Sequence, residues 1–317
     1  MNDRLKEECG IFGVYNHPEA SALVALGLHA LQHRGQEACG INSFDGKNFY
    51  LIKRRGLVGD NFTDPKIIEQ LKGHTAIGHN RYSTTGAPLI RNIQPFFADL
   101  HTGGLGIAHN GNLTNAISIR EKMVKDGAIF QTTSDTETLV QLIARSKRVK
   151  TIDKIIDAVF QVHGGYALTI MTNKKLVGVR DPYGIRPLIL GKLKDSYILS
   201  SETCALDIIG AEFVREIENG EMVVIDKNGI ESIKPFPKVK SRPCVFEYVY
   251  FSRPDSIVGG KAVHEYRKRL GEQLSKEMKI DADIVSAVPD SGVPAAIGYS
   301  NESGIPYDMG IIRNHYV

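Results

Sequence analysis

Short apolar runs, separated by turn-forming residues, fill roughly the first 230 positions of the chain. The segment 10–15 (GIFGVY) predicts a β-strand, and the segments 38–44 and 48–52 flank Asp45-Gly46, a dipeptide typical of tight hairpins. Further strands are expected at 75–79, 96–100, 105–109, 166–171, 176–180, 187–190, 196–200, 213–217 and 221–226. Strand-rich and helix-rich blocks are separated along the chain, which is typical of a layered α+β domain.

Helical spacing of apolar residues marks the segments in between. A helix over 19–32 is expected to bury the side formed by Leu23, Leu26, Ala30 and Leu31. Another helix is expected to open at Thr114. A third is expected at Ser134, where Ser134 and Glu137 have the spacing of a capping box. A fourth helix is expected over 152–162.

The proline-containing, basic segment 236–243 predicts a linker to a second domain. Beyond it we expect a strand at 245–251, and a helix over 263–278 that buries Val263, Tyr266, Leu270 and Leu274. A strand at 283–288, a helix near 293–299 and a strand at 308–312 follow. Alternation of strand and helix predicts a parallel sheet in this domain.

Composition narrows the class of protein. A chain of 317 residues suggests two domains at about 150 residues each, and 42% apolar with 24% charged residues is ordinary for a globular protein. The net charge of 39 − 36 = +3 gives no sign of a nucleic-acid or membrane partner. The start of the chain lacks the apolar core of a secretory signal, and four scattered cysteines fit the reducing cytoplasm.

Cys9 is the first candidate for chemistry, because it follows a charged octapeptide and precedes a strand. If residues 1–8 were removed, one residue would carry both a thiol and an α-amine. The pKa of an α-amine, about 7.7–8.0, suits it to accept the proton of the thiol at neutral pH. The alternative is a small buried residue that starts a strand, which is the commoner use of cysteine.

Three further positions combine chemistry with a simpler alternative. Asn110, followed by Gly111, offers an amide and a backbone N–H that could form an oxyanion hole, although Asn-Gly also favours a plain turn. Arg81 could hold a carboxylate and Asp135 an ammonium group, so that the pair would bind a free amino acid. Alone, each is more typical of a solvated surface charge.

Metal and nucleotide motifs are weak. His29 and His33 have a spacing that can fit zinc, but no third ligand has evident spacing, and the chain has neither a complete dinucleotide loop nor a P-loop. In VPDSGVPAAIG (288–298), Ser291 is expected near a helix N-terminus, where an anion or a phosphate-bound Mg²⁺ could be held. A helix cap is the alternative there.

Six segments, taken together and in this order, resemble one known family. CGIFGV, ALQHRGQEACGI, GHNRYSTTG, AHNGNLTN, SDTE and RDPYGIRPL are similar to the glutaminase domain of glutamine amidotransferases with an N-terminal cysteine. CVFEYVYFSRPDS and VPDSGVPAAIGYSNESGIPY resemble the phosphoribosyltransferase half of one branch of that family. The resemblance covers essentially the whole chain.

The resemblance implies a four-layer α/β/β/α domain of the N-terminal-nucleophile type over 9–235 and part of an α/β type I phosphoribosyltransferase domain over 244–317. It makes 1–8 a propeptide. The implied roles are nucleophile for Cys9, glutamine binding for Arg81 and Asp135, oxyanion hole for Asn110 and Gly111, a 4Fe-4S cluster ligand for Cys244 and a Mg²⁺ contact for Ser291.

The implied reaction transfers ammonia from glutamine to C1 of phosphoribosyl pyrophosphate and gives 5-phosphoribosylamine, which opens purine synthesis. Purine nucleotide inhibitors, a homotetramer and a cytoplasmic location are implied as well. The alternatives are another such amidotransferase, of the glucosamine-6-phosphate-forming kind, a self-processing hydrolase, or a non-catalytic module. The expected pyrophosphate-binding loop is absent from 244–317, so we expect a shortened chain that hydrolyses glutamine at best.

Overall fold

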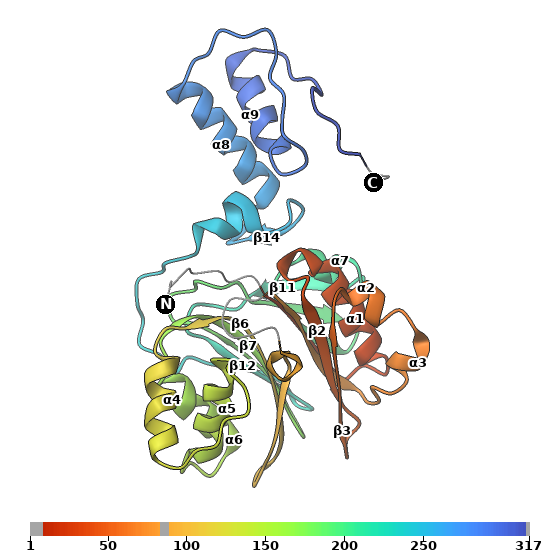
Figure 1. The fold of residues 1–317 in the computed structure, drawn as a ribbon, viewed down its shortest axis with the longest axis vertical. Helices are drawn as coiled ribbons and strands as arrows, with labels where there is room; N and C mark the ends of the chain where they lie inside the picture. Colours follow the sequence, from red (N-terminus) through yellow and green to blue (C-terminus); the bar gives the residue numbers. More distant parts are fainter. Residues whose placement is uncertain (1–8, 83–88, 315–317) are drawn as a thin grey trace. The chain divides into compact units, whose positions relative to one another are not determined.

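The computed structural model describes residues 9–82 and 89–314 (Figure 1). The chain forms two compact units, which divide between Pro243 and Cys244, at the end of the expected linker. The expected propeptide, residues 1–8, lies outside the described residues. No helix in the described ranges is both long and apolar enough to cross a bilayer.

Two antiparallel sheets form the centre of the first unit. Within the described residues, one sheet has seven strands in the order β11-β9-β10-β1-β4-β2-β3, and the other has six in the order β13-β12-β8-β7-β6-β5. The strands of the first sheet are β1 (Gly10–Tyr15), β2 (Ala38–Phe44), β3 (Phe49–Arg55), β4 (Thr75–Arg81), β9 (Ile189–Leu193), β10 (Ser196–Ser200) and β11 (Glu212–Glu216). Those of the second are β5 (Phe96–Leu100), β6 (Gly103–Leu113), β7 (Gly164–Thr172), β8 (Leu176–Arg180), β12 (Met222–Asp226) and β13 (Gly229–Ile233).

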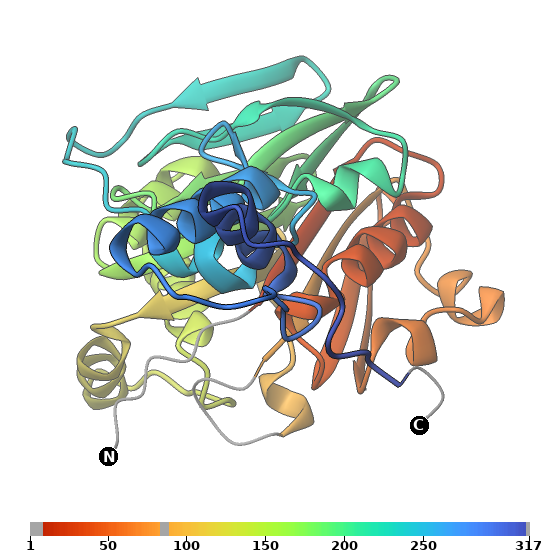
Figure 2. The ribbon, with the colours of Figure 1, turned by 90° about the horizontal axis from the view of Figure 1, so that it is seen from above.

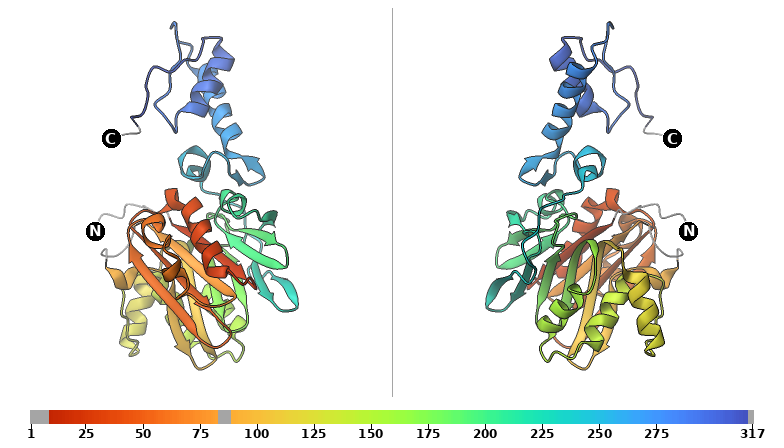
Figure 3. Two further views of the ribbon diagram at one scale, coloured as in Figure 1. Left: turned by 90° about the vertical axis from the view of Figure 1, so that its right-hand side faces the viewer. Right: turned by 90° about the vertical axis from the view of Figure 1, so that its left-hand side faces the viewer.

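Helices cover the outer face of each sheet (Figures 2 and 3). On the seven-stranded sheet lie α1 (Ala20–Ala30), η1 (Gln32–Arg34), α2 (Val58–Asn61), α3 (Pro65–Ile68) and α7 (Cys204–Asp207). On the six-stranded sheet lie α4 (Ala116–Lys125), α5 (Thr136–Arg145) and α6 (Thr151–Val159), and η2 (Ile90–Asn92) precedes β5. Separate apolar cores fill the space under each helix layer and the space between the sheets. The expected α/β/β/α layering is confirmed.

The predicted buried side of the first helix is wrong in part. Leu26 is 45% exposed, whereas Val24 and Leu28 are fully buried. Helix α1 is apolar nearly all round, so periodicity could not select the face that packs. Gly27 decides it, because the helix lies so close to β1 there that a Cβ atom would come within 2.6 Å of the Phe12 ring.

The predicted capping box is also wrong. Helix α5 begins one residue later than expected, with Asp135 rather than Ser134 at the N-cap position. Glu137 turns away from Ser134, and its carboxylate accepts hydrogen bonds from the backbone N–H groups of Gln131 and Thr132, each at 2.7 Å. The Glu137 carboxylate therefore holds the loop before α5 and does not take part in a capping box with Ser134.

The second unit contains η3 (Glu247–Phe251), β14 (Ile257–Val258), β15 (Lys261–Ala262), α8 (Val263–Glu277) and α9 (Val293–Ser303). The strand predicted at 245–251 is wrong, because this segment forms a helical turn. Its carbonyls are held by Arg267, whose Nε donates to Tyr248 O and whose Nη2 donates to Ser252 O, both at 2.8 Å. The apolar composition suited either state.

Helices α8 and α9 pack through small residues. The buried positions of α8 are Val263, Arg267, Gly271 and Ser275, so the predicted face with Leu270 and Leu274 is wrong. A Cβ atom at Gly271 would overlap the Ala295 carbonyl oxygen. The parallel sheet expected from 283–288 and 308–312 does not form in the described residues, where one bridge joins Val285 to Tyr307.

Candidate active site

Cys9 stands immediately before β1, a central strand of the seven-stranded sheet. The register pairs Gly10 with Asn80, so β1 begins beside the end of β4. The Cys9 side chain is buried, and its Sγ lies 3.9 Å from the carbonyl oxygen of Tyr82. The thiol is therefore enclosed at the end of the sheet where β1 begins and its antiparallel neighbour β4 ends.

Burial raises the pKa of the Cys9 thiol to about 11, against an opposing hydrogen bond to the Tyr82 carbonyl and the positive charges of Arg186 and Arg81. The charge of Asp135 also raises it. A thiol with this pKa is protonated at neutral pH. It needs a base at the moment of attack, because only the thiolate is strongly nucleophilic.

Arg81 and Asp135 bring opposite charges to the same place. Arg81 is the last residue of β4 and is buried, not a residue of the following loop. The Asp135 Oδ2 atom accepts a hydrogen bond from Leu113 N at 3.0 Å, which ties the start of α5 to the end of β6. Both charges act on the Cys9 thiol. An ammonium and a carboxylate of one small ligand can thus be recognised beside the thiol.

Asn110 and Gly111 lie inside β6, so the plain turn considered for Asn-Gly does not occur. The Asn110 side chain is fully buried, and neither its Oδ1 nor its Nδ2 has a hydrogen-bond partner among the described residues. Gly111 has φ +140°, and a Cβ atom there would overlap the Gly165 carbonyl oxygen. A buried amide without a partner is costly unless a ligand uses it.

His109 links these residues to the loop before α5. Its Nδ1 lies 3.0 Å from Thr136 Oγ1 and 3.9 Å from Asp135 Oδ1. Burial lowers the pKa of His109, so the ring is neutral at pH 7. Gln94 Oε1 accepts the His109 backbone N–H at 2.8 Å, and Gln94 Nε2 donates to Thr136 Oγ1 at 3.1 Å.

Three further charged residues lie in this region and were not predicted as site residues. Arg186 is buried, and its charge lowers the pKa of Cys9 and of His109. Arg34 and Glu202 form an ion pair whose side chains are both fully buried. The available signal for Arg34 and Arg186 was their place inside the family-like segments ALQHRGQEACGI and RDPYGIRPL, whereas Glu202 lies in neither segment.

The two predicted metal positions, Cys244 and Ser291, belong to the second unit. Cys244, the first residue of the second unit, is the sole cysteine of that unit in the sequence, whereas a 4Fe-4S cluster requires four ligands. Ser291 is exposed in the turn before α9, and the neighbouring Asp290 carboxylate lies 3.6 Å from Arg313 Nη1. In the described part of the chain no group of three His, Cys, Asp or Glu residues could hold a metal. Each of these residues is therefore a single possible ligand, and the other ligands of either group would have to come from elsewhere.

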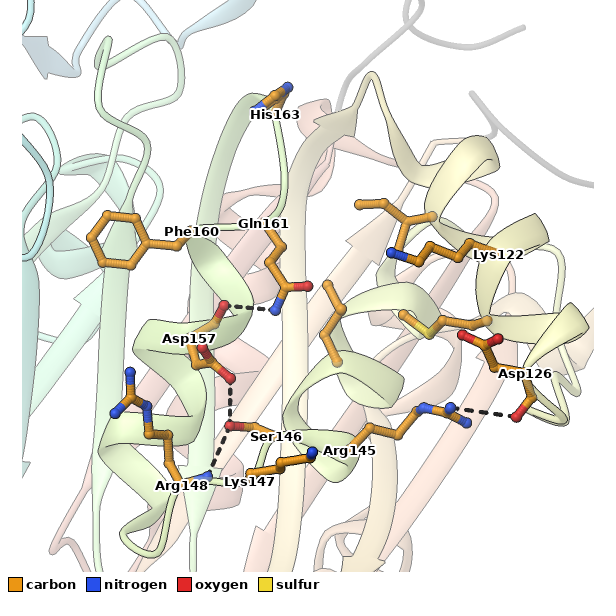
Figure 4. Close-up of a pocket in the computed structure, with 13 residues that line it drawn as sticks. Lys122, Asp126, Arg145, Ser146, Lys147, Arg148, Asp157, Phe160, Gln161 and His163 are labelled. Carbon is orange, nitrogen blue, oxygen red and sulfur yellow. Dashed lines mark hydrogen bonds between the residues drawn. The ribbon is translucent and has the colours of Figure 1, made fainter.

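A separate hollow of about 710 Å³ lies among α4, α5 and α6 (Figure 4). Its described lining includes Lys122, Arg145, Lys147 and Arg148, with Asp157 bonded to the Ser146 hydroxyl at 2.6 Å. The lining shares no residue with the Cys9 region. The hollow thus lies in the outer helix layer, outside the candidate active site.

The fold and the site match known proteins. Residues 79–207 match the family described as "Glutamine amidotransferase domain", which defines the class of the first unit. The chain is 56% identical to the amidophosphoribosyltransferase of Rhizobium etli over 99% of its own length and 64% of that relative's. The solved glutamine phosphoribosylpyrophosphate amidotransferase of Bacillus subtilis, complexed with ADP and GMP, is 43% identical with a TM-score of 0.92, covering 97% of this chain and 67% of that one.

A second solved structure, titled as the allosteric regulatory enzyme of purine biosynthesis, is 44% identical with a TM-score of 0.94. The match covers 98% of the present chain and 66% of the chain in that solved structure. The chain therefore belongs to the amidophosphoribosyltransferase family. It spans about two thirds of the length of the relatives it matches.

Proposed function

We propose that the first unit hydrolyses glutamine and that, in the whole protein, the released ammonia attacks C1 of phosphoribosyl pyrophosphate. The products would be glutamate, pyrophosphate and 5-phosphoribosylamine, the first committed compound of purine synthesis. The observation that carries the glutaminase half is the buried Asn110 amide with no partner among the described residues, on the strand whose end is tied to Asp135.

Substrate binding follows from the two charges. Arg81 would hold the α-carboxylate of glutamine in a bidentate manner, and Asp135 its α-ammonium group. A free amino acid carries both groups, whereas an internal peptide residue carries neither. This arrangement supports glutamine over the peptide substrate of a self-processing hydrolase.

The chemical steps use Cys9 and Asn110. The Cys9 sulfur attacks the carboxamide carbon of glutamine, while the proton of the Cys9 thiol moves to the α-amine of Cys9 itself. The oxygen that becomes negative is met by Asn110 Nδ2 and the Gly111 N–H, donors already in place. The C–N bond then breaks, the leaving nitrogen takes the proton and departs as ammonia, and water hydrolyses the thioester to glutamate and free thiol.

The α-amine exists only if the chain is cut before Cys9, so we propose that residues 1–8 are a propeptide. Mass spectrometry of the active protein is expected to show Cys9 as the first residue. Fully active protein that keeps Met1–Glu8 would contradict the proposal.

The remaining proposals concern the whole protein. Cys244 would supply one thiolate to a 4Fe-4S cluster and Ser291 a hydroxyl to Mg²⁺, which would help pyrophosphate depart. An iron and sulfide assay on full-length protein purified without oxygen tests the cluster. The nucleotides in the Bacillus subtilis complex support purine nucleotide inhibitors. We also propose a homotetramer, which analytical sedimentation of the full-length protein tests through its molecular mass. The four cysteines are free thiols, which supports a location in the reducing cytoplasm.

The decisive experiment is a glutaminase assay of Cys9→Ala beside Cys39→Ala. Cys39 is a buried cysteine of the same sheet, with its Sγ 3.7 Å from Gly56 O, and serves as the matched control. Cys9→Ala is expected to abolish glutamate release, while Cys39→Ala retains it. In the full-length enzyme, Cys9→Ala should still use added ammonia. Glutamine hydrolysis by Cys9→Ala refutes the nucleophile assignment.

A further inference from the structure

A buried ion pair lies directly behind the nucleophile. Arg34, the last residue of η1, has a fully buried side chain, and its Nε donates a hydrogen bond to the carbonyl oxygen of Cys9 at 2.9 Å. Its Nη1 pairs with Glu202 Oε1, and neither side chain is exposed. His33 Nε2 lies 2.7 Å from the same carboxylate oxygen.

The segment that carries Glu202 also holds the next residues of β1. Ser201 Oγ accepts a hydrogen bond from Ile11 N at 3.0 Å, and Ser201 N donates to Ile11 O at 3.1 Å. Behind Gly10, a Cβ atom would lie 3.1 Å from Leu31 Cβ, so the chain passes close to the end of α1. The start of β1 is therefore fixed from the side of the 200–202 loop.

The Cys9 carbonyl is the main-chain group that immediately precedes β1. Strand pairing begins at Gly10, one residue after Cys9. The hydrogen bond from Arg34 fixes the rotation of the Cys9 peptide group, and with it the directions in which the Cα atom projects the thiol and the main-chain nitrogen. A buried guanidinium requires a counter-charge, which Glu202 provides.

We propose that Arg34, held by Glu202, is a positioning residue that sets the orientation of the Cys9 main chain for attack on the substrate amide. The inference rests on the proposed glutaminase function. Arg34 touches neither substrate nor reacting atoms in this scheme; it acts through Cys9. Its loss is expected to lower kcat and to leave KM for glutamine nearly unchanged, because binding belongs to Arg81 and Asp135.

The test compares Arg34→Lys with Arg215→Lys in the full-length protein. Lysine keeps the charge beside Glu202, but it has one nitrogen and cannot span the carboxylate and the Cys9 carbonyl as the guanidinium does. A misplacement of about 1 Å costs roughly 100-fold in rate, so kcat for glutamine hydrolysis should fall by about that factor. Arg215 pairs with Glu221 at 2.6 and 2.8 Å, and its variant should keep wild-type kcat.

A second variant separates positioning from folding. Glu202→Gln keeps the shape of the side chain but removes the counter-charge that holds Arg34, so it should lower kcat in the same way. Because both residues act through one carbonyl, the double variant is expected to lose little more than Arg34→Lys alone. Circular dichroism and thermal melting confirm that the variants compared are folded.

The outcomes distinguish the two proposals. Folded Arg34→Lys or Glu202→Gln protein with wild-type kcat overturns the inference, and so does a rise in KM without a fall in kcat. Strictly additive losses in the double variant overturn it as well. If the wild-type protein releases no glutamate, or Cys9→Ala still does, the proposed glutaminase function fails instead.

Discussion

Asn110 combines two properties that one substitution can separate. Its amide is fully buried and has no partner among the described residues, and in the proposed reaction its Nδ2 donates to the negative oxygen of the intermediate. We expect Asn110→Ala to lower kcat for glutamine hydrolysis by about 10²–10³-fold, or about 2.7–4 kcal/mol, the usual cost of losing one such donor.

Stability should respond in the opposite way. An unsatisfied buried polar group costs about 1–3 kcal/mol, and removing it releases that cost, offset by the small cavity that alanine leaves. The free energy of unfolding of Asn110→Ala should therefore not fall. Gln94 is the contrast, because it bonds to His109 N and to Thr136 Oγ1. Gln94→Ala removes the acceptor of the buried His109 N–H and should destabilise the protein by at least about 1 kcal/mol.

The assay pairs glutamate release with urea unfolding of the wild-type, Asn110→Ala and Gln94→Ala proteins. An Asn110→Ala protein that keeps wild-type kcat refutes the oxyanion role. If Asn110→Ala instead unfolds as readily as Gln94→Ala, the amide serves the fold, and its lack of partners has been misread.

Three further predictions follow from local geometry. Because burial raises the pKa of Cys9 to about 11, alkylation of its thiol in a chain that keeps residues 1–8 should accelerate from pH 7 toward pH 11; a flat profile by peptide mass spectrometry contradicts this. Hydrogen bonds from Asn48 N, then Tyr50 Oη, lower the pKa of Asp45 to about 2, so its stabilisation is present above about pH 4 and lost as pH falls toward 2. Melts of Asp45→Asn between pH 5 and 2 should lack that part of the dependence, and an unchanged profile counts against it. Gly27→Ala places a Cβ atom 2.6 Å from the Phe12 ring and should lower the free energy of unfolding, measured in urea, by about 1–3 kcal/mol. An unchanged urea midpoint would show that α1 can shift away from β1 at no cost.

Local sequence signals were sufficient to predict structure where neighbouring strands are joined by a short turn. The hairpin at Asp45-Gly46 joins β2 to β3 as predicted, because a tight turn fixes the register of its own strands. The motif segments contain Cys9, Arg81 and Asp135, and the charges of Arg81 and Asp135 have opposite effects on the pKa of the Cys9 thiol. The motifs could not reveal that Asp135 rather than Ser134 occupies the N-cap position of α5, or that Glu137 accepts hydrogen bonds from the preceding loop.

The sequence alone indicated the family, the positions of most strands of the first unit and the candidate site residues. Tertiary structure decided which faces are buried and which charges meet. Leu26, Leu270 and Leu274 are exposed because Gly27 and Gly271 allow closer packing on other faces. Arg34 and Glu202 are 168 positions apart, and periodicity, which reports only on neighbours within a few residues, carries no signal for such a pair. Only the folded sheet brings them together behind Cys9.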